Sequence, residues 1–331
     1  MTDTRPRLVG LGSVVGAEVR TNDDAVFDWL RRHHPPGRDL FAGYRQRRVL
    51  PTGEELADIM VPAARRALAQ AATAMDDIDL VVGTASLGRW RTPNDLGEVA
   101  GLLGARPDAR ILALNDEFAT FNHAVVLADA LIGAGRARRV LVVVGSDWTR
   151  HVDYHTAPAV SASDGAAAAV VAPSAEPAAL GVLDTACELA LEYWGGMYVS
   201  PGPGHRREPE GRAAGASDGV FHLEALGIEA FEDFATTRPP AVLAGLVERH
   251  GIEPGALATV CHQASSVLLD RWRALMAPGR FVESLATYAN MTAATIGVNL
   301  AEVHAGLTQA VVGLVALGPE VSTDVVLLSA G

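Results

Sequence analysis

Short apolar runs alternate with helical segments along the whole chain, and this alternation restricts the possible fold more than any other feature. Runs such as DLVVGTA (79–85) and RVLVVVG (139–145) have the length and composition of buried strands. The segments between such runs carry apolar residues at helical spacing, as in 54–74. Strands that alternate with helices favour largely parallel sheets covered by helices, so the sequence predicts an α/β protein.

The alternation occurs twice, which predicts two βαβαβ-type units at 1–173 and 174–331, joined near 172–177. In the first unit, strands are predicted at 7–16, 79–85, 110–114, 139–145 and 165–171, and helices at 23–33, 54–74, 94–103 and 119–133. In the second, strands are predicted at 179–189, 258–262 and 324–329, an irregular segment at 193–216, an extended segment at 281–287, and helices at 223–250 (with a break near 238–240), 265–276 and 292–317. Because 119–133 and 292–317 are nearly uncharged, we expect both to be buried between the units.

Composition excludes several classes of function. The chain has 331 residues, of which 49% are hydrophobic and 20% charged, as in soluble globular proteins. Its net charge of -12 argues against a nucleic-acid partner. The sequence contains no lysine, which excludes a Schiff-base or phosphate-loop lysine. Cys187 and Cys261 are too few for a disulfide framework, and neither a signal core nor a membrane-spanning run is visible, so we expect a cytoplasmic protein with no membrane partner.

Two further motifs are weak indications of a cofactor or a metal. GLGSVVG (10–16) has the spacing GxGxxxG and no helix is predicted to follow it, so a dinucleotide cofactor is not expected. HVDYH (151–155) offers two histidines and an aspartate, whereas zinc needs three or four convergent ligands. We therefore expect neither a cofactor nor a metal.

The stretch ALNDEFATF (113–121) has the pattern of a strand-to-helix elbow. An apolar run ends, a short polar segment follows, and an Ala-rich helix begins. Elbows of this kind present a nucleophile, but Phe118 stands where a nucleophile would be expected. Asp116 and Glu117 precede it and have two interpretations, as partners of the helix dipole or as a carboxylate base at the mouth of a site.

Two further candidates follow predicted strands or extended segments in the second unit. His262, in CHQASS, ends a strand, and the carboxyl edge of a parallel sheet is where α/β proteins bind ligands. A structural histidine is the alternative, and neighbouring Cys261 is predicted to point into the core. Asn290, in YANMTAATIG, begins a helix and could simply cap it.

Several motifs in the same order give the chain a family resemblance. They are GYRQRRVLPTGEELADIMVPAARRAL, ADALIGAGRARRVLVVVGSD, SDGAAAAVV, CHQASS and ANMTAATIG. With them the chain resembles the ketoacyl synthase III branch of the thiolase-fold enzymes, including its acyltransferase relatives in fatty-acid-like and polyketide secondary metabolism. The resemblance implies a thiolase-like fold with two fused halves in five layers, α-β-α-β-α, and a homodimer.

The resemblance also assigns roles to residues. His262 matches the family's His and Asn290 its Asn, which assist decarboxylation of a malonyl thioester and stabilise the enolate. The motif that normally holds the acyl-accepting Cys falls on 117–121, with Phe118 in the Cys position. Substrate-binding roles are expected for the following residues: Thr120, Trp148, Trp90 and Ser265.

Some family features are absent. An Arg that follows HQA in CoA-using members is Val267 here, and the positions of a Trp and an Arg nearer the N-terminus are Gly37 and Phe41. An acyl carrier protein is therefore a better expected donor of the acyl thioester than CoA. The family also continues past the terminal glycine turn with one more strand, which is expected to be missing or replaced because the sequence stops at Gly331.

Phenylalanine cannot carry an acyl group, which leaves three hypotheses for position 118. His262 could activate an acceptor that attacks a thioester directly, with Asp116 or Glu117 supplying or orienting the base. His262 and Asn290 could instead decarboxylate a malonyl-type thioester. As the alternative to an enzyme, the chain could be a non-catalytic subunit in a heterodimer with an active paralogue. The retained His262 and Asn290 favour an enzyme, and the sequence leaves open whether a C–C, C–O or C–N bond is formed.

Overall fold

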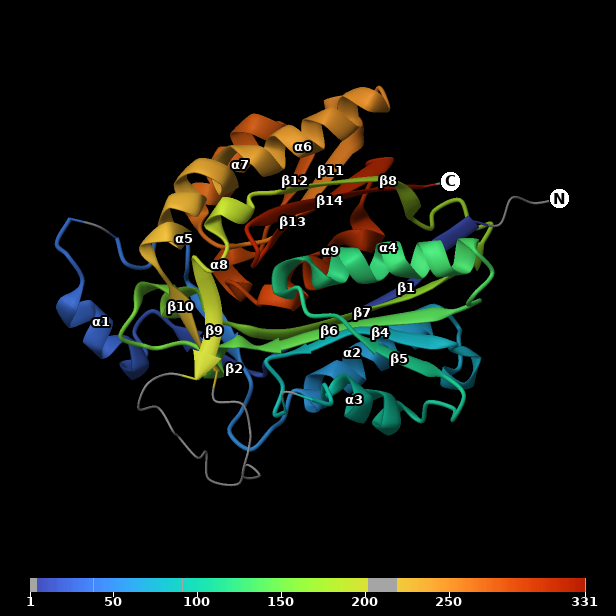
Figure 1. The fold of residues 1–331 in the computed structure, drawn as a ribbon, viewed down its shortest axis with the longest axis horizontal. Coiled ribbons are helices and arrows are strands. Elements are labelled where there is room, and N and C mark those ends of the chain that lie inside the picture. Colours follow the sequence, from blue (N-terminus) through green and yellow to red (C-terminus); the bar gives the residue numbers. More distant parts are fainter. Residues whose placement is uncertain (1–4, 38, 91, 202–218, 331) are drawn as a thin grey trace.

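Two five-stranded sheets enclose a layer of two helices (Figure 1). The computed structural model describes residues 5–37, 39–90, 92–201 and 219–330. The first sheet has the order β1-β7-β6-β4-β5 and the second the order β12-β11-β13-β14-β8. The strands of the first sheet are β1 (Arg5–Val15), β7 (Asp164–Ser174), β6 (Val140–Asp147), β4 (Leu80–Ser86) and β5 (Arg110–Ala113). Those of the second are β12 (Arg280–Val282), β11 (Leu257–Cys261), β13 (Val311–Gly318), β14 (Ser322–Ser329) and β8 (Gly181–Leu189).

The two sheets repeat one pattern of strand directions. In the first, β4 runs parallel to β5 and β6, and β7 is antiparallel to β6 and β1. In the second, β11 runs parallel to β12 and β13, and β14 is antiparallel to β13 and β8. β7 and β14 each run antiparallel to both of their neighbours. The expectation of largely parallel sheets therefore holds for only half of the strand pairs.

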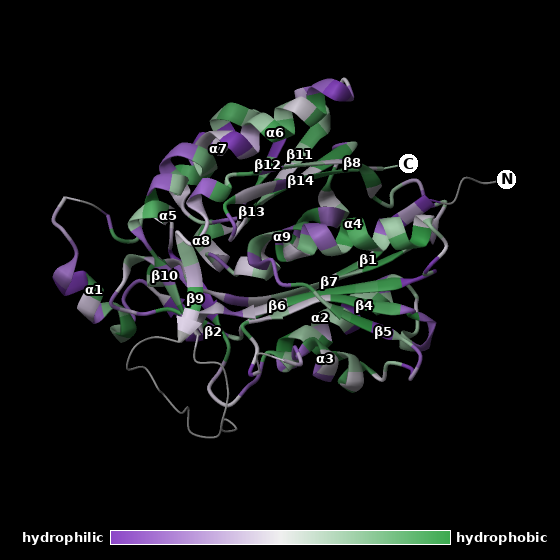
Figure 2. Ribbon diagram, in the orientation of Figure 1, coloured by the Kyte–Doolittle hydropathy of each residue, from purple (hydrophilic) through white to green (hydrophobic). Residues whose placement is uncertain are grey.

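Helices form the other three layers (Figure 1). α4 (Thr120–Gly133) and α9 (Thr295–Val303) lie between the sheets, as their lack of charge predicted. α2 (Ala57–Gln70) and α3 (Leu96–Leu103) cover the outer face of the first sheet, and α6 (Thr236–Arg249) and α7 (Ser266–Met276) that of the second. The five-layer arrangement expected from the sequence is confirmed. Figure 2 shows the corresponding hydropathy, with apolar strands inside and polar residues concentrated on the outer helices.

Smaller elements lie at one end of the layers, on the left in Figure 1. They are α1 (Asp28–His33), β2 (Glu18–Thr21), β3 (Gln46–Val49), β9 (Met197–Pro201), β10 (Gly219–Leu223), α5 (Ala225–Ala230) and α8 (Leu285–Tyr288). β2 pairs with β3 and β9 pairs with β10, both antiparallel. The predicted irregular segment 193–216 is thus wrong for 197–201, and its residues 202–216 lie outside the described part of the chain. Likewise 281–287 is not extended throughout, because β12 ends at Val282 and α8 begins at Leu285.

The prediction of one helix over 292–317 is wrong. α9 ends at Val303, a 3-10 turn covers His304–Gly306, and β13 then forms the middle of the second sheet. A short, fully apolar run fits a buried strand and a buried helix equally well, and the β-branched residues of VVGLVALG (311–318) favour the strand. With β13 counted, the second sheet has as many strands as the first, so the expectation of a missing strand is also wrong.

The predicted break at Pro239 and Pro240 is wrong as well. α6 continues through both prolines, and the irregular turn lies before them, as a π-helical segment at Phe231–Ala235. Proline has no N–H, so Pro239 leaves the carbonyl of Ala235 without its usual helical donor. The indole Nε1–H of Trp272 in α7 donates to that carbonyl at 2.8 Å. A tertiary contact therefore replaces the hydrogen bond that proline removes.

The boundary assigned between 173 and 174 remains a prediction. β7 of the first sheet ends at Ser174, and β8 of the second begins at Gly181. One apolar core joins the two units through both central helices. Within the described residues, none of the helices has the length and apolar character required to span a bilayer.

The two central helices approach closely at Gly297 of α9. A Cβ atom on this glycine would lie 2.6 Å from the Cβ of Ala167 and 2.9 Å from the ring of Phe121 in α4. No side chain fits there without displacing a neighbour. Glycine is therefore required by packing at this position.

We predict that Gly297→Ala destabilises the protein by about 1–3 kcal/mol, because the added methyl group overpacks the contact between α4 and α9. The same substitution at Gly245, in α6, meets no atom within 4 Å and should stabilise by about 0.5–1 kcal/mol. Urea unfolding of both variants measures the difference. Equal stability of the two variants would contradict the packing argument.

Candidate active site

Two helix-starting elbows meet between the sheets. In the first unit the 3-10 turn Glu117–Ala119 precedes α4, and in the second the 3-10 turn Thr292–Ala294 precedes α9. Glu117 and Thr292 have φ angles of 31° and 42°, which non-glycine residues adopt only where their surroundings hold them. The two turns contact each other. The elbow expected at 113–121 is confirmed, and the chain contains a second one opposite to it.

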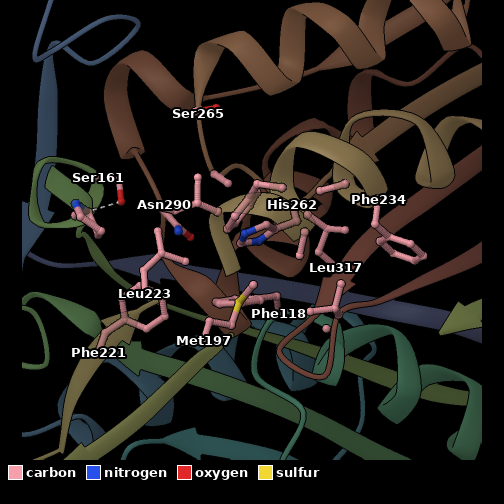
Figure 3. Close-up of a pocket in the computed structure, with 18 of the residues that line it drawn as sticks. Phe118, Ser161, Met197, Phe221, Leu223, Phe234, His262, Ser265, Asn290 and Leu317 are labelled. Atoms are coloured by element: carbon pink, nitrogen blue, oxygen red, sulfur yellow. Dashed lines mark hydrogen bonds between the residues drawn. The ribbon is translucent and has the colours of Figure 1, made fainter. Parts of the chain in front are cut away.

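A cavity of about 390 Å³ opens beside the first elbow, and we call it the His262 cavity (Figure 3). Phe118, His262 and Asn290 line it together. The Phe118 ring lies against the His262 imidazole, with 4.6 Å between ring centroids and 32° between ring planes. The remaining wall is mostly apolar and includes Met197, Phe221, Leu223, Phe231 and Phe234.

His262 follows the end of β11, and its backbone N–H donates to the Val315 carbonyl at 2.8 Å. Its side chain is only 2% exposed, and burial lowers its pKa to about 3. Nδ1 is buried and has no hydrogen-bond partner among the described residues. His262 is therefore a neutral imidazole at physiological pH, which suits a hydrogen-bond donor better than a strong base.

Asn290 is fixed from three directions. Its N–H donates to the Ser161 carbonyl at 2.8 Å, and its carbonyl accepts from the Ser163 N–H at 3.0 Å. Its side-chain Oδ1 accepts from the Thr292 N–H at 2.9 Å, which fixes the start of the elbow. The capping interpretation from the sequence is wrong, because the N-cap residues of the 3-10 turn and of α9 are Met291 and Ala294. Since Oδ1 is occupied, the Nδ2 amide is the group that Asn290 offers to the His262 cavity.

A second cavity, of about 580 Å³, adjoins the first and is also lined by Phe118, and we call it the Glu117 cavity. Glu117 and Trp90 line it, whereas His262 and Asn290 line only the first. The two cavities share four lining side chains: Phe118, Trp148, Met197 and Phe221. Phe118 is thus part of the wall between a carboxylate on one side and the His262–Asn290 pair on the other.

A serine hydroxyl fixes the position of the Glu117 carboxylate. The Ser86 hydroxyl, at the end of β4, donates to its Oε2 at 2.6 Å. Burial raises the pKa of Glu117, and the neighbouring Asp116 and Asp147 act in the same direction, while the Ser86 hydrogen bond and His151 oppose the rise. Ser86 carried no signal in the sequence beyond its place at the end of a predicted strand.

Asp116 points elsewhere and is not among the described residues that line either cavity. Its Oδ2 lies 2.7 Å from Nδ1 of His123, and Nε2 of His123 lies 3.3 Å from Oδ2 of Asp324 in β14. Hydrogen bonds to Asp116 and Asp324 raise the pKa of His123 to about 10. His123 is therefore protonated at neutral pH and joins α4 to the second sheet.

The four residues expected to bind substrate do not lie in one place in the structure. Trp148 lies in the shared wall, Trp90 lines the Glu117 cavity, and Ser265 lines the His262 cavity. Ser265 also caps α7, because its Oγ accepts from the Leu268 N–H at 3.2 Å. Thr120 is fully buried and is not among the described lining residues; its Oγ1 accepts from the Asp116 N–H at 3.3 Å. Sequence reasoning missed the apolar wall from β9, β10 and 231–235.

The HVDYH segment serves packing in the described structure. His151 Nδ1 lies 3.0 Å from the Gly219 carbonyl, and the His155 ring lies 4.6 Å from that of Trp29. Among the described residues, no three His, Cys, Asp or Glu side chains are grouped so that they could hold a metal ion.

Known proteins share this architecture. The chain has a thiolase-like fold, and two solved structures illustrate the likeness. A priming β-ketosynthase of a polyketide biosynthetic pathway has a TM-score of 0.82 at 23% identity, covering 100% of this chain and 99% of the other. OleA from Xanthomonas campestris with bound cerulenin has a TM-score of 0.82 at 17% identity, covering 99% and 98%.

Sequence comparisons define the family. The family model described as 3-oxoacyl-[acyl-carrier-protein (ACP)] synthase III matches residues 113–189. Beta-ketoacyl-[acyl-carrier-protein] synthase III 4 of Streptomyces coelicolor is 33% identical over 278 residues, 80% of this chain and 78% of the relative. The synthase III of a Synechococcus species is 31% identical over 315 residues, 89% and 86% of the two chains. The chain belongs to the beta-ketoacyl-[acyl-carrier-protein] synthase III family.

We predict that His123→Gln removes a pH-dependent contribution to stability. The pKa of His123 is raised from about 6.5 in an unfolded chain to about 10, so its contribution is complete below pH 6.5 and is lost as the pH rises to 10. The stability difference between wild type and variant should therefore shrink across that interval, as measured by urea unfolding at pH 6, 8 and 10. His33→Gln, in exposed α1, is the matched control. A difference independent of pH would contradict the assignment.

Proposed function

We propose that the protein is an acyl-thioester enzyme that holds the thioester oxygen between His262 and Asn290 and transfers the acyl group without a covalent intermediate at position 118. The observation that supports this most directly is that His262, Asn290 and Phe118 line one cavity. Family membership supports a thioester substrate, and the relatives' names support an acyl carrier protein as its carrier.

The two polar side chains suit the stabilisation of negative charge on an oxygen. A neutral imidazole N–H and the Asn290 Nδ2 amide both donate hydrogen bonds from a buried position, where such donors are most effective. Burial keeps His262 neutral, so the imidazole and the amide both donate hydrogen bonds as neutral groups. An oxyanion forms whenever a thioester carbonyl is attacked or a malonyl thioester loses carbon dioxide.

The described residues beside this pair do not supply a substitute thiol. Cys261 precedes His262 but is completely buried on the opposite side of β11, and burial raises the pKa of its thiol above the usual range. A phenyl ring at position 118 cannot form an ester or thioester. We therefore propose that the acyl group passes directly from the thioester to an acceptor.

Decarboxylation of a malonyl-type thioester is a second candidate, because it needs only the two oxyanion donors. The C–C bond to the carboxylate breaks, carbon dioxide leaves, and the electron pair forms an enolate that water then protonates. The close cover of His262 by Phe118 favours a third candidate, a non-catalytic subunit paired with an active paralogue. We propose a cytoplasmic homodimer for the enzyme and a heterodimer for that alternative.

We propose a carrier protein as the donor in preference to CoA. Val267, where CoA-using relatives are expected to carry Arg, is 76% exposed on α7 and offers no charge to a phosphate. Phe41 packs edge-on against Phe27, with 5.4 Å between centroids. No further cofactor enters the proposed reaction.

We predict that His262→Ala and Asn290→Ala each slow the loss of acyl groups from an acyl- or malonyl-carrier protein by about 10²–10³-fold, the usual effect of removing one oxyanion donor. Intact-mass spectrometry of the carrier protein measures the reaction. His33→Ala is the matched control and should react like wild type. Unchanged rates in both site variants would refute the proposed function, and an inactive wild type that gains activity only with a paralogue would support the non-catalytic subunit.

We predict that Phe118→Cys acquires an acyl adduct on incubation with an acyl-carrier protein, whereas wild type does not. The thiol would lie at the start of buried α4, beside His262, where a thiolate is stabilised. Intact-mass spectrometry of the enzyme detects the adduct. Phe118→Ala leaves the same space without a thiol and controls for reaction at Cys187. The absence of an adduct on a folded Phe118→Cys protein would show that position 118 is not the nucleophile position.

A further inference from the structure

The Glu117 cavity differs from its neighbour in chemistry. Among the described residues that line it, Glu117 is the one charged side chain. Aromatic rings make up much of its wall, and they belong to Trp90, Phe118, Trp148, Tyr198 and Phe221. The His262 cavity presents the two neutral donors His262 and Asn290, and its one charged lining residue, Glu232, is exposed, so the two cavities do not suit the same ligand group.

The Glu117 carboxylate is fixed but not neutralised. Ser86, itself only 1% exposed, donates to Oε2, and a backbone φ of 31° sets the direction of the side chain. Its charged neighbours are Asp116, Asp147 and His151. Asp116 is engaged with His123, and Asp147 lies 3.3 Å from Nε2 of His151. Asp147 also lies 3.5 Å from Arg150, so both neighbouring acids have basic partners, whereas no ion pair to Glu117 is formed among the described residues. A ligand that neutralises Glu117 therefore has to carry positive charge itself.

A partly buried carboxylate with aromatic side chains around it is a surrounding that an organic ammonium group prefers. The carboxylate provides a charge-assisted hydrogen bond, and ring faces attract cations that have lost their water. An alcohol would donate a hydrogen bond to the carboxylate but would bring no charge to neutralise it. A carboxylic acid or phosphate would be repelled by Glu117.

We infer that the Glu117 cavity binds a small primary amine, held at its nitrogen by Glu117, and that this amine is the acceptor of the acyl group. The inference rests on the proposed function and names its second substrate. Because the two cavities share the wall that contains Phe118, an amine in one lies next to a thioester in the other.

The reaction balances without another reagent. Glu117 takes one proton from the bound ammonium, and the freed amine attacks the thioester carbonyl, whose oxygen is held by His262 and Asn290. A C–N bond forms and the C–S bond breaks. The nitrogen's second proton goes to the leaving thiolate, which departs as the carrier's thiol. Glu117 then releases its proton to water, so the products are an amide, a thiol and one proton.

Binding of a model amine tests the site independently of catalysis. Phenethylamine and its neutral counterpart 2-phenylethanol are titrated into wild type, Glu117→Gln and Glu283→Gln by calorimetry. We expect Glu117→Gln to weaken phenethylamine binding at least about tenfold and to weaken 2-phenylethanol binding much less, because only the ammonium pairs with the charge. Glu283, which lies in the second unit and pairs with Arg273, is the matched control. Equal binding of phenethylamine to wild type and Glu117→Gln would overturn the inference.

Acyl transfer tests the acceptor role. Wild type, an acyl-carrier protein and phenethylamine should give the N-acyl amide by mass spectrometry, and Glu117→Gln should slow its formation at least about 10²-fold. His262→Ala should slow the reaction without weakening amine binding. Glu117-dependent binding with no amide would overturn the acceptor role. An enzyme that processes the thioester through His262 but binds no amine would overturn this inference and leave the proposed function standing.

Discussion

The packing of two largely apolar helices between two sheets is the constraint on which the site depends. Phe121 of α4 fills the space that Gly297 of α9 leaves open, so the helices are held at one separation. Their N-terminal elbows are brought together as a result. Each elbow is also tied to the first sheet by a hydroxyl, Ser86 to Glu117 and Thr292 to Ser146, both at 2.6 Å. The core and the site are thus parts of one packing arrangement.

Phe118 divides this site into two chemical environments. On one side, burial keeps His262 neutral beside the Asn290 amide, and we propose that these two groups stabilise negative charge. On the other, Glu117 carries or loses a proton in a more polar cavity. A thiol at position 118 would instead carry the acyl group in a covalent intermediate. The phenyl ring cannot do so, and because it lines both cavities we propose two substrates that meet beside it.

The sequence predicts most of this architecture and only part of the site. The two α/β units follow from the alternating pattern and the five layers from the family resemblance. Motif matching selects His262 and Asn290, which the structure places in one cavity with Phe118. The sequence pattern misassigned 292–317 as one helix, because runs of Ala, Val and Gly fit the periods of both a helix and a strand. It could not tell Asp116 from Glu117 as the acid that faces a cavity, since the local backbone at a tight elbow decides this. The wall from β9, β10 and the π-helical segment is assembled by tertiary contacts and has no local signal.

The π-helical turn at Phe231–Ala235 has a consequence for substrate size. Phe231, Phe234 and Ala235 line the far end of the His262 cavity, and the Trp272 hydrogen bond holds the turn in place before α6. This turn belongs to neither sheet nor to the central helices. Under the proposed function, substitutions in this one segment would change the length of acyl chain that the cavity accepts without altering either elbow.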